Sequence, residues 1–156
     1  MNAMFDAAYT RQEFPLGHRE KMDDGREYVF CKYNAGDGAA DASAGQIGVL
    51  LDSAYSRSEV TNDVNSATIA AINATPVGIF LGTISDGEYC WLQARGKNKE
   101  AMTTDGDVAQ GDRLMVHATT TGGVDTHDDT SKPLVGVALE DDSGTSLAAG
   151  TVDLRM

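Results

Sequence analysis

Two segments of the chain carry nearly the same pattern of hydrophobic and polar positions. DDGREYVFCKY, residues 23–33, and SDGEYCWLQAR, residues 85–95, each run from an acidic turn with glycine into Glu-Tyr and then into alternating side chains. Successive side chains of a strand point to opposite faces of the sheet. The pattern therefore predicts two strands, each with an aliphatic or thiol face and an aromatic face.

The predicted faces assign each side chain of these strands to a side. The aliphatic or thiol faces hold Val29, Cys31 and Tyr33 in the first strand and Cys90, Leu92 and Ala94 in the second. The aromatic faces hold Tyr28, Phe30 and Lys32, and Tyr89, Trp91, Gln93 and Arg95. An aromatic face packs into a core or lines an interface between subunits. Both interpretations are open, and Tyr89 and Trp91 are the candidate interface residues.

Other pairs of similar segments predict further strands with a shared sequence pattern. ASAGQIGVLL at 42–51 matches DVAQGDRLMVHA at 107–118 in placing glycine, at Gly45 and Gly111, before an apolar run. TPVGIFLGTISDG at 75–87 matches KPLVGVALEDDSG at 132–144, and FPLGHREKMDDG at 14–25 is a weaker third copy.

The spacing of these echoes predicts an internal repeat. Pro15, Pro76 and Pro133 lie roughly sixty residues apart, a period at which repeats are expected. We therefore expect three hairpin units. The alternative is a chance coincidence of common turn signals, since proline, glycine and Asp-Gly mark turns in many proteins.

One region departs from the strand pattern. In SRSEVTNDVNSATIAAIN, residues 56–73, Val60, Val64, Ala67 and Ala71 fall at helical spacing. This predicts one short helix or an ordered loop, centred on residues 65–73.

Residues 1–14 show no trusted periodicity and are predicted to form an extended N-terminal arm. The remaining residues, 15–156, are predicted to form a single β-rich domain. Short runs of β-branched and aromatic residues between glycine- and aspartate-rich turns are typical of an all-β protein. We expect an antiparallel barrel or sandwich body, of β-tulip or jelly-roll type.

The net charge of the chain limits the classes of partner that it can bind. The 156 residues include 12 basic and 24 acidic side chains, a net charge of −12. Such a surface repels phosphate, so direct binding of nucleic acid is not expected. No apolar run is long enough to span a membrane, and residues 1–14 lack the features of a signal peptide. We expect synthesis in the cytoplasm.

Candidate chemistry is sparse. ARGKN at 94–98 lacks the P-loop spacing, and no nucleophile elbow occurs. DTHDD at 125–129 offers oxygen ligands for a hard cation, but without the spacing of a known loop. Arg95, Lys97 and Lys99 form a basic cluster that suits a solvated turn or a docking point for an acidic neighbour. We expect no cofactor, no metal and no enzymatic activity.

The two cysteines are predicted to be structural. Cys31 and Cys90 lie on the aliphatic faces of their strands, where a buried thiol behaves as a small hydrophobe. A disulfide between them requires that the two strands lie within bridging distance.

Taken in order, these segments resemble a known family. The succession of PLG, DDGREYVFCKYNAG and ASAGQ, then TPVGIFLGTISDGEYCWLQARG and DVAQGD, then PLVGVALEDDSG and GTVDLRM is similar to the cement or decoration proteins of tailed-bacteriophage heads. GEYCWLQ and VGVALE are the most telling elements. The resemblance covers about residues 15–156.

The resemblance implies a structural virion protein on the outer surface of the mature head, made in the host cell. It would bind the major capsid protein and cement neighbouring subunits as a homotrimer at threefold or quasi-threefold axes. Residues 1–14 would lie along a capsid neighbour, with Phe5, Tyr9, Arg11 and Phe14 as capsid-binding residues. Tyr89 and Trp91 would line the subunit interface. Deletion of residues 1–14 would then weaken attachment and leave folding intact.

Two other functions remain open. One is another virion component, such as a head-fibre base or a tail or baseplate module. The other is an enzyme or small-ligand binder on a trimeric β-scaffold, which would need a pocket with convergent carboxylates or a metal.

Overall fold

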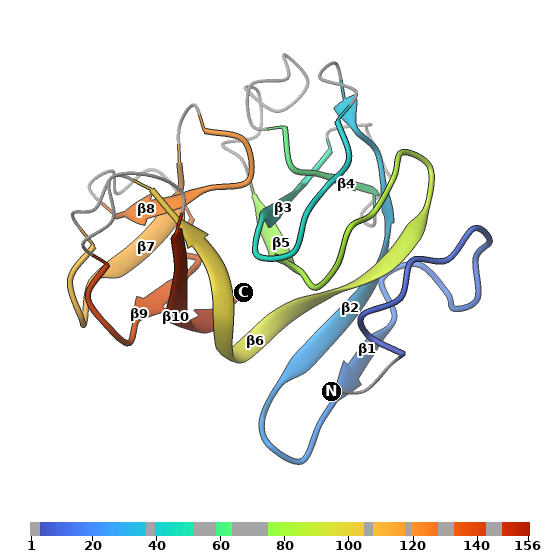
Figure 1. Ribbon diagram of the computed structural model, residues 1–156. Helices are drawn as coiled ribbons and strands as arrows, with labels where there is room; N and C mark the ends of the chain where they lie inside the picture. Colours follow the sequence, from blue (N-terminus) through green and yellow to red (C-terminus); the bar gives the residue numbers. More distant parts are fainter. Residues whose placement is uncertain are drawn as a thin grey trace.

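The computed structural model describes residues 4–36, 40–51, 59–63, 75–104, 108–117, 120–127, 133–142 and 148–156 (Figure 1). Within these ranges the ordered elements are strands joined by turns, which confirms the all-β prediction. The ten strands are β1 (Arg19–Lys21), β2 (Glu27–Tyr33), β3 (Ile47–Leu50), β4 (Glu59–Thr61), β5 (Pro76–Phe80), β6 (Tyr89–Thr103), β7 (Arg113–Val116), β8 (Val124–Thr126), β9 (Gly136–Ala138) and β10 (Ala148–Arg155).

The first ring of strands closes on itself. β2 pairs with β4 in parallel, and β4–β3, β3–β5, β5–β6 and β6–β2 are antiparallel. These five pairings form a closed five-stranded barrel, which we call barrel 1.

A second ring repeats the same scheme. β6 pairs with β8 in parallel, and β8–β7, β7–β9, β9–β10 and β10–β6 are antiparallel. This is barrel 2, and it shares the long strand β6 with barrel 1 (Figure 1). Strands β2 to β6 of barrel 1 thus correspond in order to β6 to β10 of barrel 2.

The sequence echoes fall on corresponding strands. The two segments with glycine before an apolar run contain β3 and β7, and the two best proline segments contain β5 and β9. The third proline segment contains β1, which pairs with β2 as β5 pairs with β6 and β9 with β10. This recurrence supports the interpretation as three hairpin units.

The predicted faces of β2 and β6 are confirmed by packing. Cys31 and Cys90 are partners in the antiparallel register, as are Phe30 and Trp91. The aliphatic or thiol faces fill the interior of barrel 1 together with Val60, Phe80 and Ile84. The aromatic faces lie on the outside of barrel 1, and a separate cluster covers them.

The two barrels also pack directly on each other. The core cluster that fills barrel 2, including Leu114, Val124 and Leu154, also contains Ile47, Val49 and Ile79 of β3 and β5. These three side chains therefore join barrel 1 to the core of barrel 2. At the position of β7 that corresponds to Ile47, the chain has the exposed Arg113, so the contact face differs between the repeats.

Glycine permits one close approach between the barrels. Gly45 precedes β3 at φ +87°, and a Cβ there would lie 1.9 Å from the carbonyl oxygen of Glu100 in β6. The amide of Met102 donates to the carbonyl of Gly45 at 2.8 Å. The corresponding Gly111 also has positive φ, at +95°, so the prediction that both glycines form turns is confirmed.

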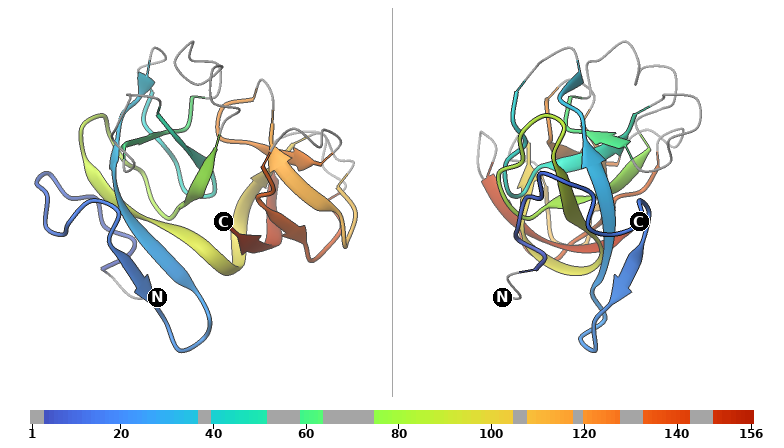
Figure 2. Two further views of the ribbon diagram at one scale, coloured as in Figure 1. Left: turned by 180° about the vertical axis from the view of Figure 1, so that it is seen from behind. Right: turned by 90° about the vertical axis from the view of Figure 1, so that its right-hand side faces the viewer.

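Two predicted segments differ from the structure or fall outside it. Val60, which contributed to the helical spacing, lies in strand β4 and is fully buried in barrel 1, where pairing with β2 and β3 outweighs the local pattern. The helix centred on residues 65–73 lies outside the described residues. The N-terminal segment forms a dark-blue loop that projects beside the strands in the left view of Figure 2, while Met4, Phe5, Tyr9 and Phe14 pack in one cluster with side chains of β2 and β6.

Candidate functional site

The aromatic faces of β2 and β6 form a third core with residues 4–14. Phe5, Tyr28, Phe30 and Trp91 are buried there, bordered by the partly buried Met4, Tyr9, Phe14, Met22, Leu81 and Tyr89. We call this set the outer aromatic cluster. It contains five of the six candidate capsid-binding and interface residues.

Ring geometry in the cluster is close and specific. The Phe5 ring stacks on Tyr28 with centroids 4.0 Å apart and meets Trp91 edge-on at 5.4 Å. Phe14 lies 5.3 Å from Phe30 and 5.1 Å from Trp91, both at steep interplanar angles. Such pairs add about 0.5–1.5 kcal/mol beyond the burial of apolar area.

Backbone pairing adds to these ring contacts. Tyr9 and Tyr89 form an isolated antiparallel bridge in which each amide donates to the other residue's carbonyl at 2.8 Å. The Tyr9 hydroxyl donates to the carbonyl of Met4 at 2.7 Å. The segment predicted as an extended arm is therefore part of the folded body from Met4 onward.

The structure places the candidate residues in different environments. Phe5 and Trp91 are 4% and 1% exposed, so in this conformation neither presents a side chain to a capsid or a second subunit. Tyr89 is partly exposed and stacks on Phe30 at 6.1 Å. Arg11 is the exposed member, at 83%, and pairs with Glu13 at 2.6 Å, which raises the pKa of Arg11.

Packing therefore reverses one expectation drawn from the sequence. Removal of residues 1–14 would uncover Tyr28, Phe30 and Trp91, so it would destabilise the fold and not only weaken attachment. The signal that could have shown this is the match of isolated aromatics in residues 1–14 to the aromatic faces of both strands.

Trp91 carries a buried donor without a hydrogen-bond acceptor. Its indole Nε1 has no hydrogen-bond partner among the described residues. The surrounding rings of Phe5, Phe14, Phe30 and His18 all meet the indole at steep angles.

A small ionic group lies next to the turn of the β1–β2 hairpin, where Lys21 pairs with Glu27. Glu27 is buried and accepts a short hydrogen bond from Arg19, while Lys21 Nζ lies 3.6 Å from the other carboxylate oxygen. The hydrogen bond from Arg19 lowers the pKa of Glu27. Arg19 and Lys21 keep 48% and 79% of their side-chain surface exposed, so two cations flank one buried carboxylate and remain accessible to solvent.

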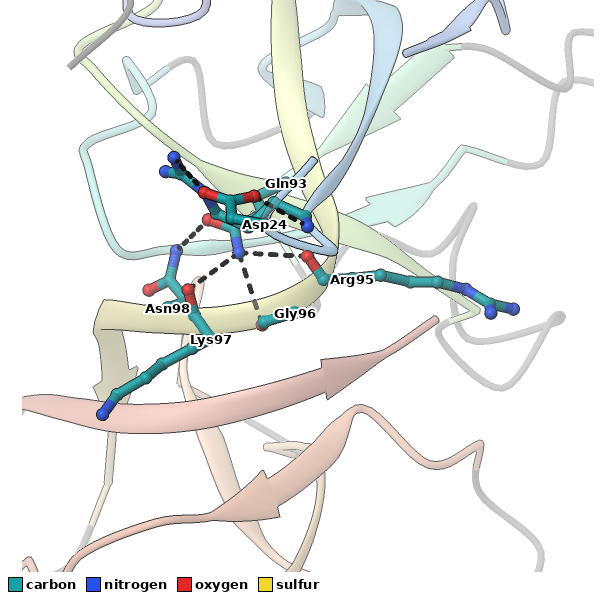
Figure 3. A network of polar contacts seen from close by, with 7 residues as sticks. Asp24, Gln93, Arg95, Gly96, Lys97 and Asn98 are labelled. Atoms are coloured by element: carbon teal, nitrogen blue, oxygen red, sulfur yellow. Dashed lines mark hydrogen bonds and ion pairs between the residues drawn. The ribbon is translucent and has the colours of Figure 1, made fainter. Parts of the chain in front are cut away.

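A polar bracket holds the bend where β6 passes from one barrel to the other. Gly96 has φ +84°, and Gln93 Nε2 donates to the carbonyls of Arg95, Gly96 and Lys97 at 3.1, 3.3 and 3.1 Å (Figure 3). Asn98 in turn donates to Gln93 Oε1 at 3.1 Å. Both amide side chains are buried. Gln93 thus satisfies three consecutive carbonyls at the bend, and Asn98 holds the Gln93 side chain while its own oxygen accepts from the amide of Glu100 at 2.8 Å.

A cleft of about 460 Å³ opens beside this bracket. Its apolar lining is Phe5, Met22, Tyr28 and Leu81, and its charged lining is Asp6, Asp24, Arg26, Lys97, Lys99 and Glu100. Arg26 bonds Asp24 at 2.7 Å and lies 5.8 Å from the centroid of the Tyr28 ring. Of the basic cluster noted in the sequence, Lys97 and Lys99 line this cleft, and Arg95 is not among its lining residues.

The cysteines are free thiols in the interior of barrel 1. Both are fully buried and lie opposite each other in the β2–β6 register. Burial raises the pKa of Cys31 to about 12 and raises that of Cys90 well above its ordinary value. Because the thiolate is the reactive form, neither thiol is poised as a nucleophile.

No family model matches the chain, and no curated protein matches it either.

Among the described residues no group of three or more His, Cys, Asp or Glu side chains is placed to hold a metal ion. The same residues include no helix of the length and hydrophobicity needed to cross a membrane.

Proposed function

We propose that this chain is a structural virion protein that binds the outside of a tailed-bacteriophage head and cements neighbouring major capsid subunits. The observation that carries the proposal is the ordered resemblance of its segments to cement and decoration proteins. Those segments coincide with the strands that build both barrels. The resemblance therefore involves the framework of the fold.

Physical properties of the molecule support this function. A cement protein needs a firm body with a broad contact surface, since it bridges several subunits of a shell under outward load. Two barrels joined by one strand and a common core provide such a body. Three copies acting together at a threefold site would convert weak contacts into strong net binding through avidity.

We assign the proposed capsid contacts to side chains that are exposed in the structure. Arg11 and the partly exposed Tyr89 are available in the described conformation, whereas Phe5 would need the N-terminal segment to leave the outer aromatic cluster. We therefore place the first capsid contacts at the surface of residues 9–13. The role of Tyr89 at a trimer interface is part of the same proposal.

Co-sedimentation with expanded, undecorated heads of the cognate phage tests the function. We expect saturable binding near one copy per capsid subunit, and trimers at the threefold sites by electron microscopy. Arg11→Ala is expected to weaken binding severalfold without a change in stability, with the exposed Arg155→Ala as the matched control. Absence of binding to expanded heads would overturn the proposal and direct attention to tails and baseplates.

A further inference from the structure

The repeat leaves one strand with an open edge. In barrel 1, β5 pairs with β6 on one side and β3 on the other, and in barrel 2 the corresponding β9 pairs with β10 and β7. β1 occupies the same place beside β2 but has no second neighbour among the described strands. Within the described part of the chain, no strand therefore fills beside β1 the place that β3 and β7 fill in the two barrels.

Hydrogen bonding shows which backbone groups face this vacancy. The amide of Phe30 donates to the carbonyl of His18 at 2.9 Å, and the amide of Met22 donates to the carbonyl of Arg26 at 2.8 Å. His18 and Met22 thus direct their backbone groups toward β2, and alternation along the strand gives Glu20 the same direction. The amides and carbonyls of Arg19 and Lys21 consequently point away from β2, toward the open edge.

We propose that this edge receives an extended segment of another polypeptide, paired antiparallel to β1 and carrying acidic side chains at two alternate positions. The direction follows from the antiparallel β3–β5 and β7–β9 pairs. The acidic side chains would lie opposite Arg19 and Lys21, which share one face, and a basic side chain between them would lie opposite Glu20.

The charges of β1 favour an acidic strand at this edge over the β1 strand of a second copy of the chain. Two β1 strands paired antiparallel about Glu20 would set Arg19 opposite Lys21 twice and Glu20 opposite Glu20. Like charges directly opposite each other destabilise a strand pair. With Glu27 bonded to both cations, their face keeps a net positive charge on a chain of net charge −12, so it selects an acidic strand.

Backbone amide exchange of the free protein, read by NMR, is the first test. We expect the amides of Arg19 and Lys21 to exchange about tenfold or more faster than those of Glu20 and Met22, because only the latter pair with β2. Equal protection of all four amides would mean that the edge is already covered, and the proposal would fail.

A peptide titration of the full chain is the second test. The probe is a capped peptide, Thr-Val-Glu-Lys-Glu-Val-Thr, and its control is the charge-reversed Thr-Val-Lys-Glu-Lys-Val-Thr. We expect saturable shifts centred on Arg19 and Lys21, with binding about tenfold tighter for the acidic peptide. No binding, equal binding of the two peptides, or shifts centred elsewhere would each overturn the proposal.

Two variants at Lys21 separate strand pairing from simple attraction of charge. Lys21→Pro removes an outward-pointing amide and leaves the β1–β2 ladder intact, whereas Lys21→Ala removes only the charge. We expect Lys21→Ala to weaken the acidic peptide severalfold and Lys21→Pro to abolish its binding, with equal thermal stability of the two variants. Equal binding by the two variants would show an ionic contact without strand addition.

Discussion

Cys31 and Cys90 show how one residue type takes its chemistry from its position. Each thiol is fully buried on the inner face of barrel 1, and burial is the main cause of its raised pKa. In the unfolded chain both thiols return to ordinary values. The difference between the two states links their protonation to stability.

The thiols are expected to make stability fall in mild alkali. Below about pH 8 both states hold the thiol protons. Above it the unfolded state ionises first, since an unfolded thiol has a pKa of about 8.5 whereas Cys31 keeps its proton to about pH 12 when folded. The free energy of unfolding should therefore decline from about pH 8 to about pH 9.5 in urea titrations, below the range of tyrosine ionisation.

The control is the double variant Cys31→Ala/Cys90→Ala, which should lose this slope while having lower stability throughout. In native protein at neutral pH, a thiol-specific disulfide reagent should react with neither cysteine until urea unfolds the chain. Rapid reaction in the native state, or an unchanged slope in the double variant, would contradict the assignment.

At the scale of elements, residues 4–14 form an additional layer that covers an apolar outer face of barrel 1. Barrel 1 has two apolar outer faces, and barrel 2 covers one of them through Ile47, Val49 and Ile79. The other face, with Phe30 and Trp91, is covered by the N-terminal segment.

Phe5→Ala is expected to lower the free energy of unfolding by about 3 kcal/mol, since the ring is buried against Tyr28 and Trp91. Trp91 is the sole tryptophan, so its emission should also shift to the red as water reaches the cluster. Urea unfolding followed by fluorescence measures both effects. Arg11→Ala, in the same segment but 83% exposed, should change stability by less than about 0.5 kcal/mol. A similarly small effect of Phe5→Ala would show that the segment is not part of the core.

Prediction from sequence succeeded where the signal was local. The alternation in EYVFCKY and EYCWLQAR gave both faces of β2 and β6 correctly, because each strand holds its own period of two. Gly45 and Gly111 were recognised as turns because only glycine takes their backbone conformation without strain.

Prediction failed where distant segments decide the structure. The partner of Phe5 depends on the path of residues 4–14, which carry no period of their own. The parallel β2–β4 pair rests on a strand of three residues, Glu59–Thr61, too short for its pattern to compete with the helical spacing around it. The cleft beside Gln93 could not be foreseen either, because its walls come from four separate parts of the chain.

At the scale of the whole molecule, β6 makes the two barrels one cooperative unit. Its residues 89–95 pair with β2 and residues 95–103 pair with β10. The core of barrel 2 also reaches into β3 and β5. Neither barrel can lose its structure without removing a strand and part of a core from the other.

Leu114→Ala, in barrel 2, is therefore expected to shift the unfolding transition reported by Trp91 on barrel 1. Truncation of the fully buried Leu114 side chain should lower the free energy of unfolding by about 3 kcal/mol. Fluorescence and far-ultraviolet circular dichroism should give one coincident urea transition for this variant, as for the parent chain. A Trp91 transition that stays at its original midpoint would mean that the barrels unfold separately.

The sharing of β6 also sets a simple rule for growth of this architecture. Each barrel closes its ring with the first two strands of the following unit, β5 and β6 for barrel 1 and β9 and β10 for barrel 2. Three units therefore yield two barrels, and any further unit would yield one more. An in-frame tandem duplication of the segment between Pro76 and Pro133 would thus lengthen the molecule by a whole barrel, with every strand keeping its own or an equivalent neighbour. Lineages carrying this fold are accordingly expected to differ in length by multiples of roughly sixty residues.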